Sequence, residues 1–322
     1  MDHPAHLDLA ARRPDALGVH SVDRVVFAVP DLSEAQSFYR AFGLDTRRQG
    51  DHLDVYTAGG SHCWMSIHES GPRKQLQYLR LGAFAQDLEA LREVIASRGI
   101  ATEAHPLSDG EGLWLRTPDA VAIQIVAAPK VSPGAKTQPL SPAPVAAGRR
   151  AAPARSRVAR VRPRTLSHVL LFTADVSRML AFSREVLGLR LSDHSGDIIA
   201  FMHGAHGSDH HLIAFAKSDA PGLHHTSWDV GSIDEVGHGA EQMRAAGYVQ
   251  GWGVGRHVLG SNYFYYVRDP WGSYAEYSFD IDFVPHDVEW PAADHRPEDS
   301  LYVWGPPPPD NFTTNYEPPV AA

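Results

Sequence analysis

The polar and apolar positions along the first 128 residues predict a regular alternation of strands and helices. A strand-like run at Val22 to Val29 precedes Pro30-Asp31-Leu32-Ser33, a typical helix start, and a helix from Glu34 to Phe42 that ends at Gly43. A second helix is expected at Asp87 to Ser97. Further strands are expected at Leu53 to Ala58, Cys63 to His68, Gln75 to Leu81, Gly112 to Thr117 and Ala120 to Val126. We interpret this order as two β-α-β-β-β units.

The same pattern returns after residue 164. Leu166 to Phe172 matches the first strand, and Asp175-Val176-Ser177 matches Asp31-Leu32-Ser33 at the start of the following helix. The remaining elements are expected at Ile198 to Met202, His210 to Ala216, Leu223 to Val230, the helix Ile233 to Ala246, and a hairpin within residues 252–279. This internal repeat predicts an α+β fold of two domains, each built from two β-α-β-β-β units.

Three segments lie outside this pattern. Residues 1–18 are polar and unpatterned, so we expect a flexible arm. In residues 284–322, Trp290, Tyr302 and Trp304 lie among prolines, so we expect a tail that wraps the second domain, a subunit interface or a pocket mouth. Residues 129–164 are rich in Pro, Ala and Arg, which predicts a solvated linker that buries nothing. The expected domains therefore span residues 19–128 and 165–283.

Composition narrows the class of protein. The 322 residues contain one cysteine, Cys63, which excludes an internal disulfide framework and a multi-cysteine metal site and fits a reducing compartment. No apolar run is long enough to span a bilayer, and we expect a cytoplasmic protein. The net charge is −9 although residues 130–164 contain nine Lys or Arg and no acid, so the rest of the chain is strongly acidic and a nucleic acid is not expected as the main partner.

Three polar residues in the predicted strands of the second domain suggest a metal site. His168 lies in the first strand of the third unit, His225 in the first strand of the fourth, and Glu276 in its last strand. Two imidazoles and one carboxylate form the facial ligand set of non-haem iron(II), which leaves coordination positions open. Each residue alone could equally be an ordinary polar residue on the solvated face of a sheet.

The related positions of the first domain make it less plausible that these three are ordinary polar residues of a solvated sheet face. Overlaying the repeats puts Arg24 or Asp23 near His168, Tyr78 near His225 and Gln124 opposite Glu276, so the first domain keeps the scaffold without the ligand set. If the scaffold required these residue types, both domains should contain them.

Further candidates surround this set. On the predicted strand of the third unit, His211 occupies the position related to Glu276, which makes it either a fourth ligand or an acid/base beside the metal. His257 follows Gly255-Arg256 in a glycine-rich loop, where an imidazole can transfer protons. A four-residue loop at 269–272 would place Tyr265 opposite Glu276, whereas a three-residue bulged loop would place Tyr266 there, and periodicity leaves both open.

Five motifs carry a family resemblance: Leu166-Ser167-His168-Val169, Asp209-His210-His211, Gly222-Leu223-His224-His225, Gly255-Arg256-His257, and Phe264-Tyr265-Tyr266 through Asp269-Pro270 to Glu276-Tyr277. Together they resemble the two-domain (type I) extradiol ring-cleavage dioxygenases of the vicinal oxygen chelate superfamily. The resemblance covers roughly residues 20–283; it is specific in the second domain and architectural in the first, for which it implies a domain without metal ligands.

The resemblance implies a function and a role for each residue. His168, His225 and Glu276 would bind Fe(II), with Mn(II) as the alternative, and O₂ would be the co-substrate for opening the ring of a catechol. His211 would be the acid/base, and His257 would bind the substrate hydroxyl region. Tyr266 would be the catalytic tyrosine, because the interval from Gly-Arg-His matches only Tyr266. We also expect a homo-oligomer.

Two other functions remain open at this stage. A glyoxalase- or epimerase-type lyase or isomerase would use His211 as a fourth ligand around Zn²⁺ or Ni²⁺, and would leave His257 and Tyr266 without roles. A non-enzymatic protein of the same fold would bind an aromatic ligand and need no metal.

Overall fold

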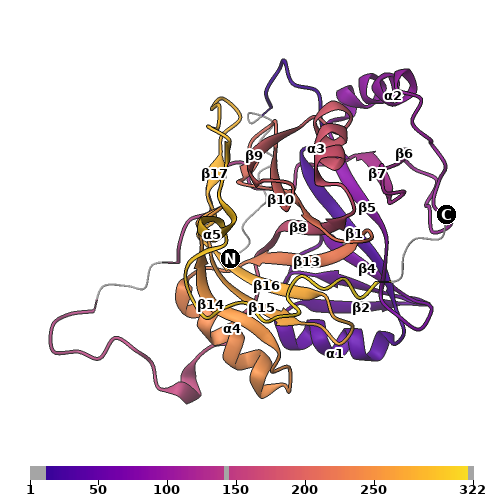
Figure 1. Cartoon of the computed structure of the whole chain (residues 1–322). Helices are drawn as coiled ribbons and strands as arrows, with labels where there is room; N and C mark the ends of the chain where they lie inside the picture. Colours follow the sequence, from indigo (N-terminus) through magenta and orange to yellow (C-terminus); the bar gives the residue numbers. More distant parts are fainter. Residues whose placement is uncertain (1–11, 141–144, 318–322) are drawn as a thin grey trace.

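The computed structural model describes residues 12–140 and 145–317, and they form two mixed β-sheets flanked by helices (Figure 1). The first sheet has seven strands in the order β2-β3-β4-β1-β5-β7-β6. Its elements are β1 (Ser21–Val29), α1 (Leu32–Phe42), β2 (Asp45–Gln49), β3 (His52–Tyr56), β4 (Cys63–Glu69), β5 (Gln75–Ala83), α2 (Leu88–Ser97), β6 (Leu113–Arg116) and β7 (Ala122–Ala127).

The second sheet has ten strands in the order β18-β9-β10-β12-β8-β13-β16-β15-β14-β19. Its domain contains β8 (Thr165–Thr173), α3 (Val176–Glu185), β9 (Leu189–Ser195), β10 (Ile199–Gly204), β12 (Ile213–Lys217), β13 (Gly222–Asp229), α4 (Ile233–Ala245), β14 (Gly251–His257), β15 (Tyr263–Arg268) and β16 (Tyr274–Phe279). The chain ends with β18 (Ala293–Asp294), α5 (Pro297–Ser300) and β19 (Tyr302–Trp304), and a separate pair joins β11 (Ser208–Asp209) to β17 (Phe283–Val284).

These elements confirm the predicted α+β fold with an N-terminal and a C-terminal domain, but one expectation about the units was wrong. The second unit of the first domain has only two strands after its helix, because residues 98–112 form no strand before β6. Strands β2 and β9 were not predicted. The sequence of β2, DTRRQ, lies at a sheet edge with its last three residues exposed, so no apolar alternation marks it.

Helix boundaries follow local capping chemistry. The Asp31 side chain accepts hydrogen bonds from the backbone N–H groups of Ser33 and Glu34, at the predicted start of α1. At the other end Gly43 adopts φ +105°, and a Cβ there would lie 2.2 Å from the carbonyl oxygen of Val161. The side chains of Asp175 and Ser232 cap α3 and α4 in the same way.

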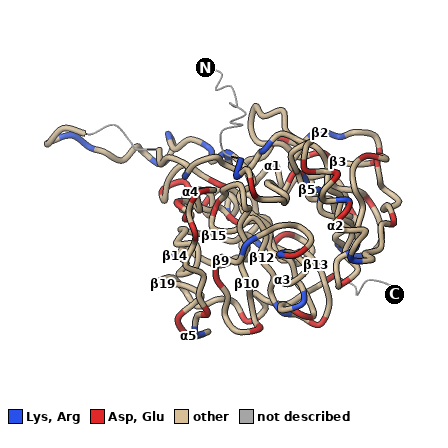
Figure 2. Tube along the Cα trace, turned by 90° about the horizontal axis from the view of Figure 1, so that it is seen from above, with Lys and Arg blue, Asp and Glu red and all other residues tan. Residues whose placement is uncertain are grey.

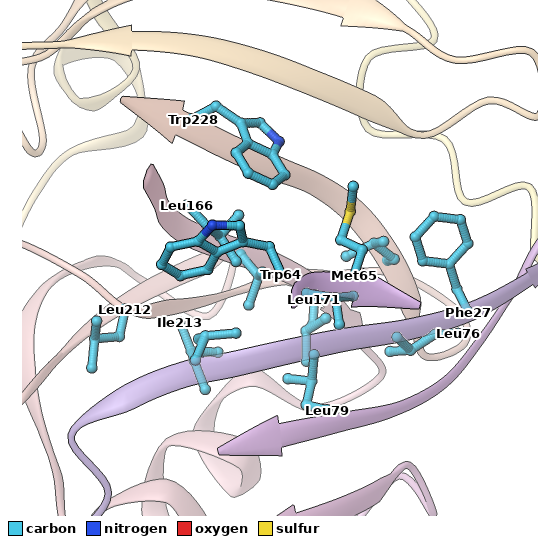
Figure 3. Close-up of a cluster of buried hydrophobic side chains, with 14 of the residues drawn as sticks. Phe27, Trp64, Met65, Leu76, Leu79, Leu166, Leu171, Leu212, Ile213 and Trp228 are labelled. Carbon is cyan, nitrogen blue, oxygen red and sulfur yellow. The ribbon is translucent and has the colours of Figure 1, made fainter. Parts of the chain in front are cut away.

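A hydrophobic core runs between the two domains rather than being confined to either. Side chains from β1, β4 and β5 meet side chains from β8, β12 and β13, and Trp64 lies at right angles to Trp228 with ring centroids 6.5 Å apart (Figure 3). Helix α1 packs against α4 (Figure 1). Phe42 stacks on Tyr277 at 3.9 Å between centroids. The domains therefore fold onto each other.

Tyr277→Phe tests this interface. The Tyr277 hydroxyl donates a hydrogen bond of 2.8 Å to the carbonyl oxygen of Phe42, and the side chain is fully buried. Removing the hydroxyl leaves that carbonyl without this donor, so we expect a loss of about 1–3 kcal/mol in unfolding free energy, measured by urea denaturation. Tyr263→Phe is the matched control, since Tyr263 lies on the neighbouring strand and is partly exposed. Equal stability of the two variants would contradict the expectation.

The segments outside the domains are more closely attached than the sequence predicted. Residues 1–11 of the expected flexible arm lie outside the described residues, while Arg12 pairs with Asp87 at 2.6 Å. Most of the linker is exposed and extends from the body with Lys and Arg but no acid (Figure 2). The expectation that it buries nothing was wrong, because Val161 is only 1% exposed and its N–H donates to Gln242.

The C-terminal tail wraps the second domain. It adds β18 to one edge of the ten-stranded sheet beside β9 and β19 to the other edge beside β14, and the buried Phe312 packs on Trp252, Tyr266 and Tyr274. Among the described residues, no helix combines the length and the apolarity needed to cross a membrane.

Candidate metal centre

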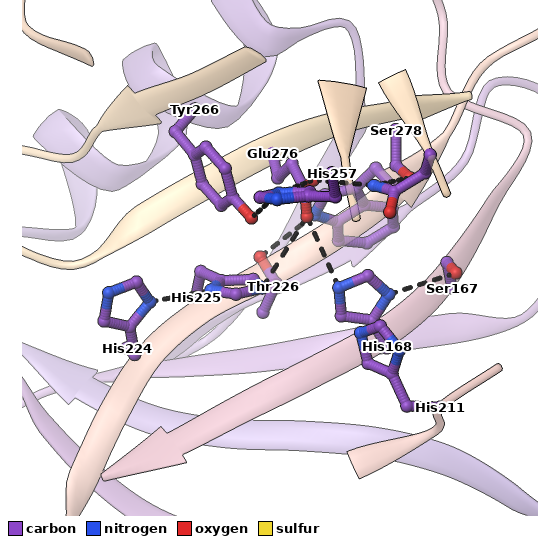
Figure 4. A network of polar contacts seen from close by, with 12 residues as sticks. Ser167, His168, His211, His224, His225, Thr226, His257, Tyr266, Glu276 and Ser278 are labelled. Atoms are coloured by element: carbon purple, nitrogen blue, oxygen red, sulfur yellow. Dashed lines mark hydrogen bonds and ion pairs between the residues drawn. The ribbon is translucent and has the colours of Figure 1, made fainter. Parts of the chain in front are cut away.

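His168, His225 and Glu276 converge from three adjacent strands, β8, β13 and β16 (Figure 4). They are 2%, 3% and 0% exposed, and one ligand atom from each lies within 4.8 Å of the others. Glu276 Oε2 lies 3.4 Å from His168 Nε2 and 3.6 Å from His225 Nε2. The structure thus brings together the three residues that the sequence selected.

Strand alternation explains why these side chains point away from the core. The side chains of Val169 and Leu171 lie on one face of β8 and pack in the interdomain core. Those of His168 and Leu170 lie on the opposite face. His168 pairs with Ser227 on β13, and Ser227 pairs with Glu276 on β16, so the register places the carboxylate two strands from the imidazole.

The donor atoms fit a divalent metal ion. His225 Nε2 and Glu276 Oε2 are buried and have no hydrogen-bond partner, whereas Glu276 Oε1 accepts a hydrogen bond of 3.1 Å from Asn262. Burial opposes ionisation of Glu276, but His168 and His257 outweigh it and lower its pKa. Buried polar atoms left without partners are costly, and a cation bound by two nitrogens and one carboxylate oxygen would satisfy them.

Both candidate histidine ligands are oriented through their other ring nitrogen. His168 Nδ1 lies 3.3 Å from Ser167 Oγ, which donates a hydrogen bond of 2.7 Å to Asp209. His225 Nδ1 lies 2.7 Å from Nδ1 of His224. Supports of this kind fix the ring and its tautomer. The sequence patterns did not predict that Ser167, Asp209 and Asn262 would support the candidate ligands. Only Ser167 carried a signal of such a role, because it is adjacent to His168 in the sequence.

The predicted placement of His211 on a strand was wrong. Strand β12 begins at Ile213, and its register with β8 makes Ala214, not His211, the residue related to Glu276. His211 precedes the strand, yet its ring centroid lies 4.0 Å from that of His168 (Figure 4). Burial and the neighbouring histidines, first among them His168, lower its pKa well below the usual value, so the imidazole is neutral.

His257 and Tyr266 form a hydrogen-bonded pair beside Glu276. The prediction that His257 lies in a loop was wrong, because His257 is the last residue of β14. The strand is held in place by pairing with β15 on one side and β19 on the other. Its Nε2 lies 2.9 Å from the Tyr266 hydroxyl and 3.8 Å from Glu276 Oε1. Its Nδ1 lies 2.8 Å from the Leu301 carbonyl, a tail contact that sequence patterns did not reveal.

The turn after β15 resolves which tyrosine faces Glu276. Tyr266 pairs with Glu276 and Tyr265 with Tyr277, as the bulged loop requires. The Asp269 N–H donates to the Ser273 carbonyl, enclosing three residues, and Gly272 adopts φ +106°. Tyr265 points instead into the interdomain core.

The first domain has no such ligand set at the equivalent positions. Across three neighbouring strands of the first sheet, Arg24 pairs with Arg80 and Arg80 pairs with Gln124. In the second sheet the corresponding pairs are His168 with Ser227 and Ser227 with Glu276. Tyr78 likewise takes the position of His225, because Tyr78 pairs with Val26 and His225 with Leu170. The described residues of the first domain thus keep the strand register without the metal-binding side chains.

Comparison with known proteins identifies the family. Residues 165–277 match the model of the Glyoxalase/Bleomycin resistance protein/Dioxygenase superfamily. Over 301 residues, 93% of both chains, the sequence is 51% identical to metapyrocatechase 2 of Cupriavidus necator. The chain belongs to the extradiol ring-cleavage dioxygenases of this superfamily.

Solved structures agree with this dioxygenase fold. The Mn(II)-bound glyoxalase from Novosphingobium aromaticivorans superposes with a TM-score of 0.71 at 25% identity, covering 92% of this chain and 94% of that one. A variant of homoprotocatechuate 2,3-dioxygenase from Brevibacterium fuscum gives a TM-score of 0.74 at 16% identity, covering 95% and 84%. The second likeness shows the fold alone. Family membership and the candidate ligand set together make this a metal-dependent dioxygenase.

Proposed function

We propose that this dioxygenase cleaves the aromatic ring of a catechol-type substrate with O₂ at Fe(II) held by His168, His225 and Glu276. The observation that carries the proposal is the buried, partly unpartnered donor set of two imidazoles and one carboxylate. Such a set leaves coordination positions for a diol and for O₂, and the bound metal would supply the redox chemistry and the Lewis acidity. The relative named metapyrocatechase 2 supports a catechol as the substrate class.

His257 and Tyr266 are suited to take a proton from the substrate diol. His257 Nδ1 must donate to the Leu301 carbonyl, which only accepts, so in the neutral ring Nε2 accepts from the Tyr266 hydroxyl. The Tyr266 oxygen then has a free lone pair for a substrate hydroxyl. Burial raises the pKa of Tyr266 well above its usual value, and burial lowers that of His257, so both groups start neutral. A proton accepted by Tyr266 can pass on to His257.

His211 is suited to act on the other side of the cluster. It is neutral and 3% exposed, and it contacts His168 and the ring of Phe201. A neutral imidazole here can accept a proton and later return it, which is general acid–base catalysis. We therefore assign His211 as the acid/base and keep it out of the ligand set.

An assay with the protein reconstituted anaerobically with Fe(II) tests this function. We expect 3- and 4-substituted catechols to give O₂ uptake in a 1:1 ratio to substrate and a yellow ring-opened product. The protein reconstituted with Mn(II) is the matched comparison, because the same donor set suits both ions. Turnover without O₂ would instead indicate a lyase or isomerase. Tight binding of the aromatic ligand without metal or turnover would indicate a binding protein.

The oligomeric state is a separate matter, and the homo-oligomer expected from the sequence stays a prediction.

A further inference from the structure

Two pairs of adjacent histidines surround the metal centre with the same geometry. In each pair an inner ring faces the cluster, His211 in one and His225 in the other, and an outer ring lies behind it, His210 and His224 respectively. The Nδ1 atoms of His211 and His210 are 3.0 Å apart, and those of His225 and His224 are 2.7 Å apart. One hydrogen bond thus joins the two rings of each pair.

The partner of each outer ring determines where the hydrogen atoms lie. His210 Nε2 lies 2.9 Å from Asp193 Oδ2, and His224 Nε2 lies 2.8 Å from the Phe312 carbonyl. A carboxylate and a carbonyl only accept, so Nε2 of each outer ring carries its hydrogen. In a neutral outer ring Nδ1 must then accept from Nδ1–H of the inner ring. The inner ring is left with an unprotonated Nε2.

The two pairs differ in the charge of that acceptor. His225 is supported through His224 by a neutral carbonyl, which is enough to set a tautomer. His211 is supported through His210 by the carboxylate of Asp193, which is 6% exposed. A charged acceptor makes a stronger hydrogen bond than a neutral carbonyl, so the chain through His210 holds the tautomer of His211 more firmly.

Asp193 is held as an ionised acceptor by the C-terminal tail. Its Oδ1 accepts from the N–H of Ala293 at 3.0 Å and lies 2.8 Å from His295 Nε2, while Trp290 Nε1 donates to Oδ2 at 3.3 Å. Burial opposes ionisation, but the hydrogen bonds from His210, His295 and Ala293 outweigh it and lower the pKa of Asp193 to about 2. The carboxylate therefore stays charged throughout the neutral range.

We propose that Asp193 and His210 are positioning residues for His211: through two successive hydrogen bonds they fix its hydrogen at Nδ1 and leave its Nε2 unprotonated beside the metal centre. This inference rests on the proposed function, in which His211 is the acid/base. A buried carboxylate that sets the tautomer and orientation of a catalytic histidine is an established arrangement in other acid/base sites. Here the carboxylate acts through a second imidazole.

The tautomer of His211 is testable without catalysis. ¹⁵N-histidine NMR of the metal-free full chain should show His211 with its hydrogen on Nδ1, the signal being assigned by its loss in His211→Phe. In His210→Phe the Nδ1 acceptor is gone, and we expect the His211 signals to shift toward the Nε2–H tautomer. An unchanged tautomer in His210→Phe would overturn the inference. Since this measurement needs neither metal nor substrate, its outcome is separate from that of the catechol assay.

Kinetics distinguish positioning from a structural role. In His210→Phe and in Asp193→Asn, which keeps the shape and removes the charge, we expect kcat to fall about 10–100-fold, the range expected for loss of one hydrogen bond to a charged group. KM should stay within about threefold and metal content should not change. Asp193→Glu, which restores the charge, should recover part of kcat.

The matched control is His194→Gln, next to Asp193 on β9 but turned to the Gly196 carbonyl. It should retain the parent kcat. A kcat within twofold of the parent in both Asp193→Asn and His210→Phe would overturn the inference, and Asp193→Asn decides alone if His210→Phe does not fold.

Discussion

Glu276→Gln should yield a folded protein that no longer retains its metal. The substitution keeps the shape of the side chain but removes the negative charge from a position that is fully buried between His168 and His225. Removing residues that merely support a ligand already costs about 10–100-fold in affinity or activity, so loss of the ligand itself should lower activity by more than about 100-fold. Metal analysis after Fe(II) reconstitution is the primary measurement.

Thermal unfolding shows whether this loss is specific. Because a ligand that binds only the folded state raises the unfolding midpoint, added Fe(II) should stabilise the parent protein and leave the midpoint of Glu276→Gln unchanged. Ser278→Ala is the matched control: Ser278 lies two residues along β16, is 1% exposed, and accepts a hydrogen bond from Asn262. It should retain the metal. Full metal content and activity in Glu276→Gln would rule out the proposed ligand set.

His211→Phe should separate metal binding from catalysis. The aromatic ring fills the same space beside His168 but can neither accept nor donate a proton. Loss of a general acid/base typically costs about 10²–10⁴-fold, so we expect kcat to fall by that range while Fe(II) content stays at the parent level. The measurements are steady-state O₂ uptake and metal content on the same preparation.

A control for this variant is available in the first domain. His105→Phe replaces an imidazole that packs near Trp114, away from the metal centre, and should leave kcat unchanged. If iron content collapses in His211→Phe instead, His211 is a fourth ligand. The lyase or isomerase interpretation of the site would then regain support.

The repeat in the sequence predicted the fold because both domains use the same local signals. In both domains an apolar strand is followed by an aspartate that caps a helix, Asp31 in the first and Asp175 in the second, and a glycine follows the helix. These signals act within about ten residues of each other. Strand β2 escaped prediction because its last three residues are exposed at a sheet edge, which leaves no apolar alternation to detect. The short pairings of β18 and β19 escaped for a related reason, since their partners lie 100 and about 50 residues away.

The candidate ligand set was predictable from the sequence, whereas the residues around it were not. His168, His225 and Glu276 each lie on a strong strand, so alternation and the repeat place them on one face. His211 lies on irregular chain before β12, where periodicity does not apply, and its position was therefore wrongly inferred even though it lies beside His168.

By itself the sequence determined the two-domain α+β fold, the candidate ligand residues of the second domain and the absence of such residues at the related positions Arg24, Tyr78 and Gln124. Those properties depend on local propensity and strand alternation. Only the tertiary structure decided that Tyr266 faces Glu276, since a turn with Gly272 at φ +106° sets the register. It also decided that the carbonyls of Leu301 and Phe312 and the tail around Asp193 orient His257, His224 and His210, because such contacts between distant segments form only when the chain folds.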